Sequence, residues 1–339
     1  MKILGIETSC DETAVAVVKG RNILSNVIAS QTAAHAPFGG VVPEIASRHH
    51  IENIPLILDQ ALALAGVRLN EIDGIAATCT PGLLTALLVG LQFGKSLAFA
   101  LKKPFVGVNH IEGHLNSVFL AEPSLEESLP QYPYLGLIVS GGHTHLYQIK
   151  KFGRYQLLGA TKDDACGEAY DKVAKLLGLG YPGGPKLDKL AALGNPKAFR
   201  FTQPRLKDDS LDFSFSGVKT ACLLQVQKQN GILSENFIHD MAASFQNMAT
   251  DYLITRIGQA ARRHNLENIA VTGGVAANSA LRAKLKTFAE ENDCRYFIPS
   301  LPLCTDNGAM IAYVGGRYLE MGLRSPLSLN AQAYSGLPA

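Results

Sequence analysis

Two segments of this chain share one pattern, in which two apolar runs flank a short polar stretch. In the first segment, Lys2–Ile6 and Ala14–Val18 flank polar residues 7–13. In the second, Leu135–Val139 and His145–Ile149 flank residues 140–144. Apolar runs joined by a few polar residues are typical of a β-hairpin. Because the hairpin pattern occurs twice, far apart in the chain, we expect a duplicated fold.

Helical and strand patterns alternate after each hairpin. The chain predicts helices over 44–65, 83–101 and near 168–178 and 235–264, strands over Gly74–Ala77, Phe105–Val108 and Asn268–Val271, and a last helix from near Asp306. This alternation predicts an α/β protein with mostly parallel sheets. A duplicated α/β fold with a nucleotide cleft between its lobes is the architecture of the actin, Hsp70 and sugar-kinase (ASKHA) superfamily.

The same pattern suggests where the lobes begin and end. We expect an N-terminal lobe over residues 1–115, completed by C-terminal residues from about 311 to 339, and a C-terminal lobe over residues 134–310. Residues 116–133 are the expected linker, because the stretch from Glu122 to Pro133 is rich in Pro, Glu and Ser. The tail after Ser325 shows no clear element.

A histidine pair follows the strand predicted at 105–108. His110 and His114 are four residues apart, so on a helix they would share one face and could hold one ion. Zinc proteases have an H-E-x-x-H motif with a general base directly after the first histidine, whereas here Glu112 is two residues on and would point away. The alternative is a loop or helix end whose histidines bond only to the backbone.

Composition narrows the class of protein. The net charge is +2, which excludes a global polycation but not a local basic stripe for RNA. The six scattered cysteines include no C-x-x-C pair and indicate reduced thiols of a cytoplasmic protein. The apolar run from Leu83 to Leu101 is interrupted by Gln92 and Lys95 and predicts a buried helix of a soluble protein.

Several further motifs occur in a characteristic order with the histidine pair. They are Gly5–Thr13 (GIETSCDET), Gly40–Arg48 (GVVPEIASR), Val139–Thr144 (VSGGHT), Asp163–Lys172, Tyr181–Pro185 (YPGGP), Asp212–Lys219, Gly273–Asn278 (GGVAAN) and Cys304–Met310 (CTDNGAM). The series closely resembles the bacterial tRNA N6-adenosine threonylcarbamoyltransferase family (TsaD type), formerly labelled O-sialoglycoprotein endopeptidases. The resemblance spans roughly residues 2 to 322. One departure is Thr80-Pro81-Gly82, where the family usually has Gly-Pro-Gly.

The resemblance implies a two-lobed ASKHA fold with the active site in the interlobe cleft. It implies transfer of a threonylcarbamoyl group from threonylcarbamoyl-adenylate to N6 of the adenosine 3′ to the anticodon, with release of AMP. The tRNAs would be those that read codons beginning with A. The implied partners are an inactive paralogue (TsaB type) and a small P-loop ATPase (TsaE type).

The resemblance also assigns site residues. His110, His114 and Asp306 would be the ligands of a divalent metal ion, Fe(II) or Zn(II), which would act as a Lewis acid. The residues that would bind the adenylate substrate are Ile138, Val139, Ser140, Gly141, Gly142, Asp171, Gly184 and Asn278. Taken without the family, Thr305 or Asp306 would instead be a helix cap, and Asp171 would be one of several exposed helix charges.

Two roles are suggested by the residues themselves. Asp11 and Glu12 lie at the tip of the first hairpin, where either could orient or deprotonate the attacking amine, and Asp11 is the favoured hypothesis. The alternative is an exposed acidic turn. For tRNA, the candidate basic residues are Arg200, Arg205, Lys207, Lys219, Arg262, Arg263, Arg282, Lys284 and Lys286. Since the net charge is small, we expect the isolated chain to bind tRNA weakly.

Three other functions compete with the transferase. A metallopeptidase is disfavoured by the position of Glu112, and an ASKHA-type ATPase or kinase by Ser140, where such enzymes generally have a second acidic residue. A non-catalytic scaffold should lack part of the His/His/Asp set, which this chain retains in full.

Overall fold

The computed structural model describes residues 1–120, 129–204, 206, 210–229 and 231–338. The chain forms two compact units, Met1–Leu129 with Pro299–Leu337, and Pro130–Ile298 with Pro338–Ala339. Residues 299–310, which we expected in the C-terminal lobe, therefore lie in the first unit. Of the expected linker, 121–128 fall outside the described residues.

The first unit is built on a five-stranded sheet of order β3-β2-β1-β4-β5. Its strands are β1 (Lys2–Glu7), β2 (Glu12–Lys19), β3 (Asn22–Ser30), β4 (Gly74–Thr80) and β5 (Phe105–Asn109). β1 pairs with β2 in antiparallel register and β4 pairs with both β1 and β5 in parallel register. The first predicted hairpin is confirmed, and its tip lies at the same edge as the carboxyl ends of β1, β4 and β5.

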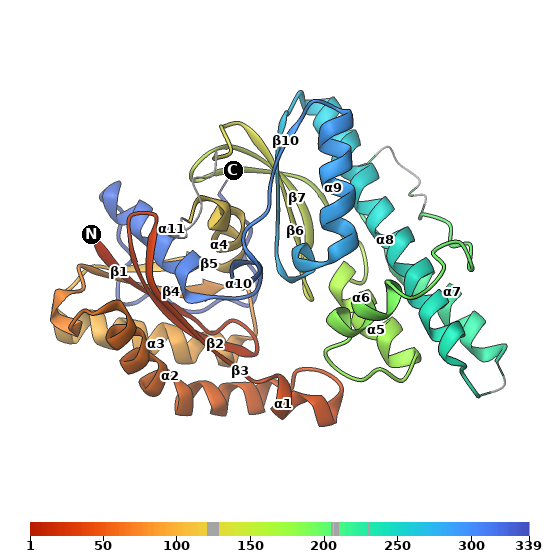
Figure 1. The fold of residues 1–339 in the computed structure, drawn as a ribbon. Helices are drawn as coiled ribbons and strands as arrows, with labels where there is room; N and C mark the ends of the chain where they lie inside the picture. Colours follow the sequence, from red (N-terminus) through yellow and green to blue (C-terminus); the bar gives the residue numbers. More distant parts are fainter. Residues whose placement is uncertain (121–128, 205, 207–209, 230, 339) are drawn as a thin grey trace. The chain divides into compact units, whose positions relative to one another are not determined.

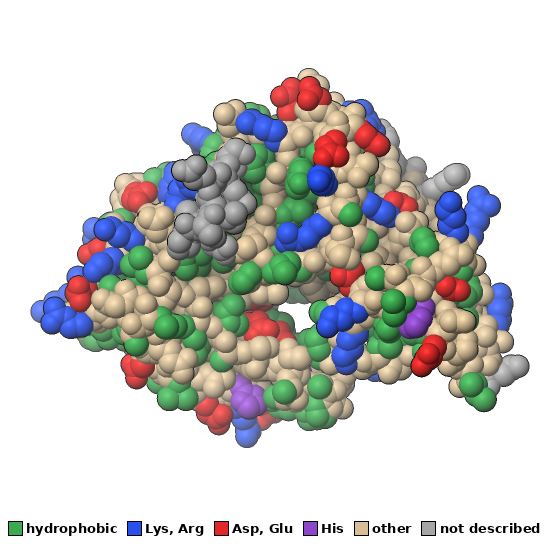
Figure 2. All heavy atoms as spheres, viewed as in Figure 1, with side chains coloured by type: hydrophobic (Ala, Val, Ile, Leu, Met, Phe, Trp, Pro, Cys, Tyr) green, Lys and Arg blue, Asp and Glu red, His purple; other side chains and the backbone are tan. Residues whose placement is uncertain are grey.

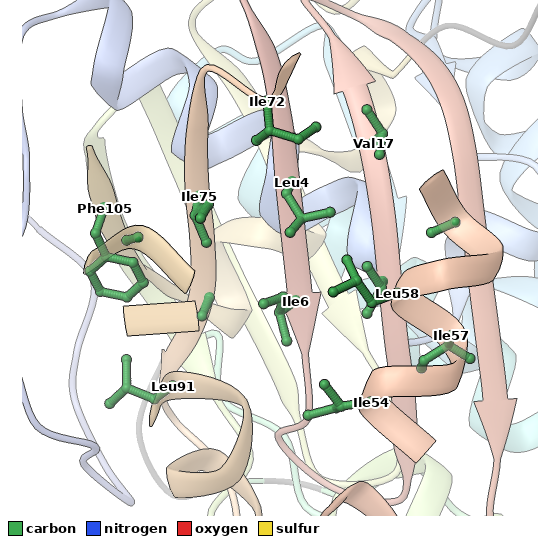
Figure 3. Close-up of a cluster of buried hydrophobic side chains, with 14 of the residues drawn as sticks. Leu4, Ile6, Val17, Ile54, Ile57, Leu58, Ile72, Ile75, Leu91 and Phe105 are labelled. Carbon is green, nitrogen blue, oxygen red and sulfur yellow. The ribbon is translucent and has the colours of Figure 1, made fainter. Parts of the chain in front are cut away.

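Helices cover both faces of this sheet, as Figure 1 shows. The helical segments of the first unit are α1 (Thr32–His35), η1 (Ala36–Phe38), α2 (Pro43–Ala65), η2 (Leu69–Glu71), α3 (Leu84–Leu101), α4 (His110–Asn116), η3 (Ser117–Phe119), α10 (Leu301–Cys304) and α11 (Gly308–Glu320). α2 and α3 pack on one face, with Leu4 and Ile6 of β1 against Ile54 and Leu58 of α2 (Figure 3). α3 is long and apolar enough to cross a membrane, but it packs on β4, β5 and α2 as a core helix.

The opposite face of the sheet is covered by α11, which approaches the strands very closely. A Cβ atom added to Gly5 of β1 would lie 2.2 Å from the carbonyl oxygen of Gly308, and one added to Gly315 would lie 2.3 Å from the Cβ of Ala76. Only glycine allows this separation. The N-terminus of α11, which follows Asp306, is thereby held against the end of the sheet.

The second unit repeats the topology of the first. Its strands are β6 (Tyr134–Val139), β7 (Thr144–Lys151), β8 (Arg154–Ala160), β9 (Asn268–Thr272) and β10 (Arg295–Phe297), in the order β10-β9-β6-β7-β8. β6, β7 and β8 are antiparallel neighbours, while β6, β9 and β10 run parallel. Each sheet is thus a three-stranded meander extended by two parallel strands, and the predicted duplication is confirmed.

The helical segments of the second unit include the long helix predicted at 235–264. They are α5 (Cys166–Leu176), α6 (Gly184–Ala191), α7 (Ser216–Gln227), α8 (Glu235–His264), η4 (Gly274–Ala277) and α9 (Ser279–Glu291). α8 packs on β6 and on α9, which in turn covers β10. Both ends of α8 are capped. The Ser234 side chain accepts a hydrogen bond from the Phe237 amide, and Asn265 ends the helix in the left-handed conformation.

The tail after Ser325 runs along the edge of the first sheet. The Ser325 amide donates to the Phe105 carbonyl, the Gly107 amide donates to Ser325 Oγ, and the Gln332 amide donates to the Cys79 carbonyl. Lys95 Nζ of α3 donates to the Leu329 carbonyl at 2.8 Å. The tail therefore covers the edge strand β5, whose backbone groups would otherwise be unpaired.

Candidate metal centre and substrate site

The histidine pair lies on a helix, as the spacing predicted. α4 begins at His110 because the preceding Asn109 caps it: Asn109 Oδ1 accepts hydrogen bonds from the amides of Ile111 (2.8 Å) and Glu112 (3.4 Å). His110 and His114 are both buried, and their rings meet edge to face with centroids 4.7 Å apart. The alternative, a loop or helix end whose histidines bond only to the backbone, is wrong, because the ring nitrogens of both histidines lie against carboxylates.

Asp306 joins the two histidines from a distant part of the sequence. Its Oδ1 atom lies 3.0 Å from His114 Nε2 and 3.5 Å from His110 Nε2. The cap of α11 is Asn307, whose Oδ1 accepts from the Met310 amide, so the reading of Asp306 as the cap is wrong. One ligand atom from each of the three residues lies within 4.8 Å of the others.

A buried carboxylate orients His110 from behind. Glu7 Oε2 lies 3.0 Å from His110 Nδ1 and also accepts a 2.6 Å hydrogen bond from Thr78 Oγ1. Because an ionised carboxylate only accepts, Nδ1 of a neutral His110 carries the proton and its Nε2 lone pair is directed toward Asp306. Burial opposes charge on His110, but Asp306 and Glu7 together raise its pKa to about 9. No motif in the sequence indicated this contact of Glu7 with His110.

Glu112 is turned away from this cluster. Its Oε1 accepts a 2.7 Å hydrogen bond from Tyr318 Oη of α11, and its side chain is buried. It thus ties α4 to α11 and does not face the donors of the histidines. The expected difference from the H-E-x-x-H arrangement is confirmed.

The donor set fits a divalent metal ion. Imidazole nitrogen and carboxylate oxygen suit Zn(II) and Fe(II), and two donors on one such ion lie roughly 3–3.5 Å apart. The separations of 3.0 and 3.5 Å between the imidazole nitrogens and Asp306 match this spacing. The three residues are therefore a group able to hold a metal ion, and three protein ligands leave positions open for a substrate.

Asp11 and Glu12 lie beside the cluster on the first hairpin. Glu12 is partly buried, and its Oε1 accepts a 2.9 Å hydrogen bond from Ser30 Oγ. Burial raises the pKa of Glu12 to about 7, and the charges of Asp11 and Asp306 add to the rise. A carboxyl group with a pKa near 7 suits proton transfer at neutral pH. Asp11 is also partly buried.

In the second unit, the residues expected to bind the adenylate gather at one edge of the sheet. Ile138 and Val139 are buried at the end of β6, and Ser140, Gly141 and Gly142 form the turn into β7. A Cβ atom on either Gly141 or Gly142 would meet nothing within 4 Å, so this turn is open to an approaching ligand.

α5 and α6 bring two more of the expected residues to this edge. The Gly167 amide at the start of α5 donates to the Ser140 carbonyl at 3.1 Å. One turn later, Asp171 Oδ1 accepts from the amides of Gly183 (2.7 Å) and Gly184 (3.3 Å). Asp171 therefore holds the start of α6 and is not one of a row of solvated helix charges.

Asn278 lies beyond the carboxyl end of β9 but is already engaged within the protein. Its Oδ1 caps α9 by accepting from the Leu281 amide, and its Nδ2 donates to Asp188 Oδ1 (3.1 Å) and Gln246 Oε1 (2.8 Å). β9 runs parallel to β6, and ligands of α/β sheets bind beyond such strand ends. Asn278 is thus well placed, but its amide nitrogen is directed toward protein groups.

Comparison with known proteins decides the family. A family model described as tRNA N6-adenosine threonylcarbamoyltransferase (TsaD) matches residues 22–313. The chain belongs to this family.

Individual relatives agree over nearly the whole length. The chain is 51% identical to the tRNA N6-adenosine threonylcarbamoyltransferase of Syntrophotalea carbinolica, over 98% of this chain and 96% of the relative. It is 52% identical to that of Cyanothece sp., with the same coverage. Among solved structures, full-length HypF matches with a TM-score of 0.60 at 16% identity, over 94% of this chain and 46% of HypF. HypF from T. kodakarensis gives the same TM-score. The fold is the two-lobed α/β fold of the ASKHA type, as expected.

The basic residues considered for tRNA differ in how they are held. Lys219 Nζ lies 2.7 Å from Asp164 Oδ2, and Lys284 Nζ lies 2.6 Å from Asp251 Oδ1, so both are committed to internal ion pairs. Arg200, Arg262 and Arg263 are exposed. Arg205 and Lys207 lie outside the described residues. On the face drawn in Figure 2, basic and acidic side chains are interspersed, in keeping with the net charge of +2.

Proposed function

We propose that this chain transfers the threonylcarbamoyl group from threonylcarbamoyl-adenylate to N6 of the adenosine 3′ to the anticodon, in tRNAs that read codons beginning with A. The N6 amine attacks the acyl carbon, a C–N bond forms, the C–O bond to the phosphate breaks and AMP leaves. The observation that carries this proposal, within a chain of the TsaD family, is the convergence of two imidazoles and a carboxylate within 4.8 Å.

We propose His110, His114 and Asp306 as ligands of one divalent ion per subunit, Fe(II) or Zn(II). Such an ion, when bound, supplies a Lewis acid for the acyl carbonyl. Glu7 holds the ring of His110 by its Nδ1 atom, and Asn109 holds the helix that carries both histidines. The two imidazole rings are thus already oriented before the reaction begins.

Asp11 and Glu12 are the proposed groups for proton handling. The attacking amine loses a proton as the C–N bond forms, and a nearby carboxylate accepts it. The raised pKa of Glu12, about 7, supports Glu12 as the proton acceptor. Asp11, one residue closer to the hairpin tip, would then orient the amine.

The proposed adenylate site is the edge formed by Ile138, Val139, Ser140, Gly141 and Gly142 with Asp171, Gly184 and Asn278. Its support is the open Gly141–Gly142 turn, whose backbone amides can approach a phosphate. We also propose that the protein acts in the cytoplasm with a TsaB-type paralogue and a TsaE-type ATPase. All six cysteines are free thiols, which suits a reducing compartment.

The test supplies threonylcarbamoyl-adenylate and unmodified tRNA to the purified chain, with and without the two partners. Nucleosides of the digested tRNA are analysed by mass spectrometry. His110→Ala should abolish threonylcarbamoyladenosine, whereas His49→Ala, a partly exposed histidine of α2, should not. Absence of product from the wild type with both partners present would contradict the proposal. ATPase and peptidase assays on the same preparation would then test the two alternatives.

A further inference from the structure

The motif Gly40–Arg48 has no part in the chemistry proposed above, yet it leads into a buried polar network. Four polar side chains lie together between β2, α1 and α2 with almost no exposure: Thr13 (0%), Gln31 (3%), His35 (0%) and His50 (0%). Buried polar groups are costly unless they are paired. The pairing here determines which atom donates at each step.

The donor and acceptor roles in the network follow from one backbone amide, because a backbone N–H can only donate. The Val42 amide, at the N-cap of α2, lies 3.3 Å from His35 Nδ1, so Nδ1 is an acceptor. The proton of neutral His35 is therefore on Nε2, which lies 3.2 Å from Gln31 Oε1 and donates to it. The orientation of the Gln31 side-chain amide follows, because the amide oxygen must face His35 to accept this hydrogen bond.

The amide nitrogen of Gln31 then faces the other side of the network. Nε2 donates to the Ala46 carbonyl (3.3 Å) and points at His50 Nδ1 (3.2 Å). His50 Nδ1 is consequently an acceptor, and it also receives the hydroxyl of Thr13 at 2.8 Å. The proton of His50 must be on Nε2, which donates to the Cys10 carbonyl at 3.0 Å.

The network ends on the hairpin tip that carries Asp11. His50 Nε2 holds the carbonyl of Cys10, and the backbone amide of Gln31 donates to the carbonyl of Asp11 at 3.1 Å. The carbonyl groups of Cys10 and Asp11 thus both accept hydrogen bonds from residues of this network. Both histidines must be neutral, and burial lowers the pKa of His50 accordingly.

We propose that the His35–Gln31–His50 network is a positioning device, which fixes the backbone of Cys10 and Asp11 and thereby sets where the Asp11 carboxylate meets the attacking amine. The inference rests on the proposed function, since it assigns a role to the loop used in that reaction. His35, Gln31 and His50 touch no substrate themselves; they act through the loop. The segment Gly40–Val42 takes part because the Val42 amide donates the first hydrogen bond of the network, to His35 Nδ1.

The first test concerns the network alone and needs no activity. Nitrogen-15 NMR of the imidazole rings distinguishes the two neutral tautomers. We expect both His35 and His50 as neutral rings protonated on Nε2 at pH 7. An Nδ1-protonated or a charged ring at either position would overturn the assignment, whatever the protein catalyses.

The second test distinguishes the hydrogen bond made by His50 Nδ1 from the one made by His50 Nε2. In His50→Gln, the side-chain amide reaches as far as Nε2 and keeps a donor for the Cys10 carbonyl. In His50→Asn, the shorter amide keeps a partner for Thr13 but loses the contact with Cys10. We expect His50→Asn to lower kcat by roughly 10–100-fold, since a misplaced group costs about that much, with KM for the adenylate and metal content unchanged. His50→Gln should restore most of kcat.

The matched control is His49→Asn, one residue earlier on α2, whose side chain is 39% exposed. It should transfer like the wild type. Equal kcat for His50→Asn, His50→Gln and the wild type would overturn the inference and leave the proposed function standing. A loss of metal or of folding in His50→Asn would indicate a general structural role and would also overturn it. If the wild type forms no product, the proposed function fails, and the NMR result still decides the network.

Discussion

Glu7 Oε2 and His110 Nδ1 lie 3.0 Å apart in the interior of the first unit, although 103 positions separate the two residues in the sequence. Glu7 ends β1 and His110 starts α4, directly after β5. β1 and β5 both pair in parallel with β4, so their carboxyl ends meet at one edge of the sheet. The topology itself thus brings the carboxylate behind the histidine.

We expect Glu7→Gln to weaken metal binding. A carboxylate on the far nitrogen of a histidine ligand holds its tautomer and orientation, and its loss typically lowers metal affinity about 10–100-fold. Titration of the metal-free protein with Zn(II) against a competing chelator measures the change. Glu44→Gln, an exposed residue paired with Arg48, is the control. Equal affinity for Glu7→Gln and the wild type would show that Glu7 does not support the ligand.

The raised pKa of Glu12 predicts a pH dependence of stability. In the unfolded chain its pKa is near 4.5, and in the folded protein it is about 7. Below pH 4.5 the group is protonated in both states and burial costs little. Between pH 4.5 and 7 the unfolded chain ionises while the folded protein still holds the proton, so this contribution to stability falls progressively and is lost above pH 7.

Glu12→Gln should therefore be more stable than the wild type at pH 8, by at most about 3 kcal/mol. The difference should shrink between pH 7 and pH 4.5, because Gln keeps an acceptor for Ser30 and has no charge to bury. Denaturant unfolding of both proteins at several pH values gives the difference. A gap that does not change with pH would contradict the raised pKa.

The ion pairs of the basic residues predict which ones contact tRNA. Lys219 is held by Asp164, so Lys219→Met should lower stability but leave the salt dependence of tRNA binding unchanged. Arg262 is exposed, and if its charge meets a phosphate, Arg262→Gln should reduce the slope of log K against log salt by about 0.7–0.9. Filter binding of the assembled complex over a range of salt concentrations compares the two. A smaller slope for Lys219→Met would show that its ion pair opens on binding.

Much of the fold could be predicted because its signals are local. The hairpins, α2, α3, α8 and the strands β4, β5 and β9 each follow from a continuous apolar pattern bounded by turn residues. β3 and β8 were not predicted. β3 is mostly half-buried, and β8 alternates irregularly, so neither shows a clear run of apolar residues. Pairing with β2 and β7 places them in the sheets.

Residues of the candidate site could be predicted only where they form a recognisable motif in the sequence. His110 and His114 have a helical spacing, but Asp306 reaches them through the packing of α11 on β1, which no local pattern reveals. Glu7 and His50 are isolated polar residues in the sequence. Their partners, His110 and the Cys10 carbonyl, come from other elements, so the roles of Glu7 and His50 emerge only in three dimensions. That the active site lies between the lobes stays a prediction.

The close approach of α11 to β1 links the stability of the first unit to the geometry of the proposed metal site. A Cβ atom at Gly5 would lie 2.2 Å from the Gly308 carbonyl and 2.5 Å from the Ala312 amide nitrogen, both of them backbone atoms that cannot rotate away. Gly5→Ala must therefore push α11 from the sheet. Overpacking of this kind typically costs about 1–3 kcal/mol.

Because Asp306 precedes α11 by only two residues, the same displacement should move its carboxylate away from His114. We expect Gly5→Ala to lower both the free energy of unfolding and the affinity for Zn(II), as measured by denaturant unfolding and chelator competition. Gly217→Ala is the matched control: a Cβ atom at this glycine in the first turn of α7 meets nothing within 4 Å, so both stability and Zn(II) affinity should stay close to those of the wild type. If Gly5→Ala lost stability but bound Zn(II) like the wild type, the position of Asp306 would not depend on the packing of α11, and the ion would itself hold Asp306 in place.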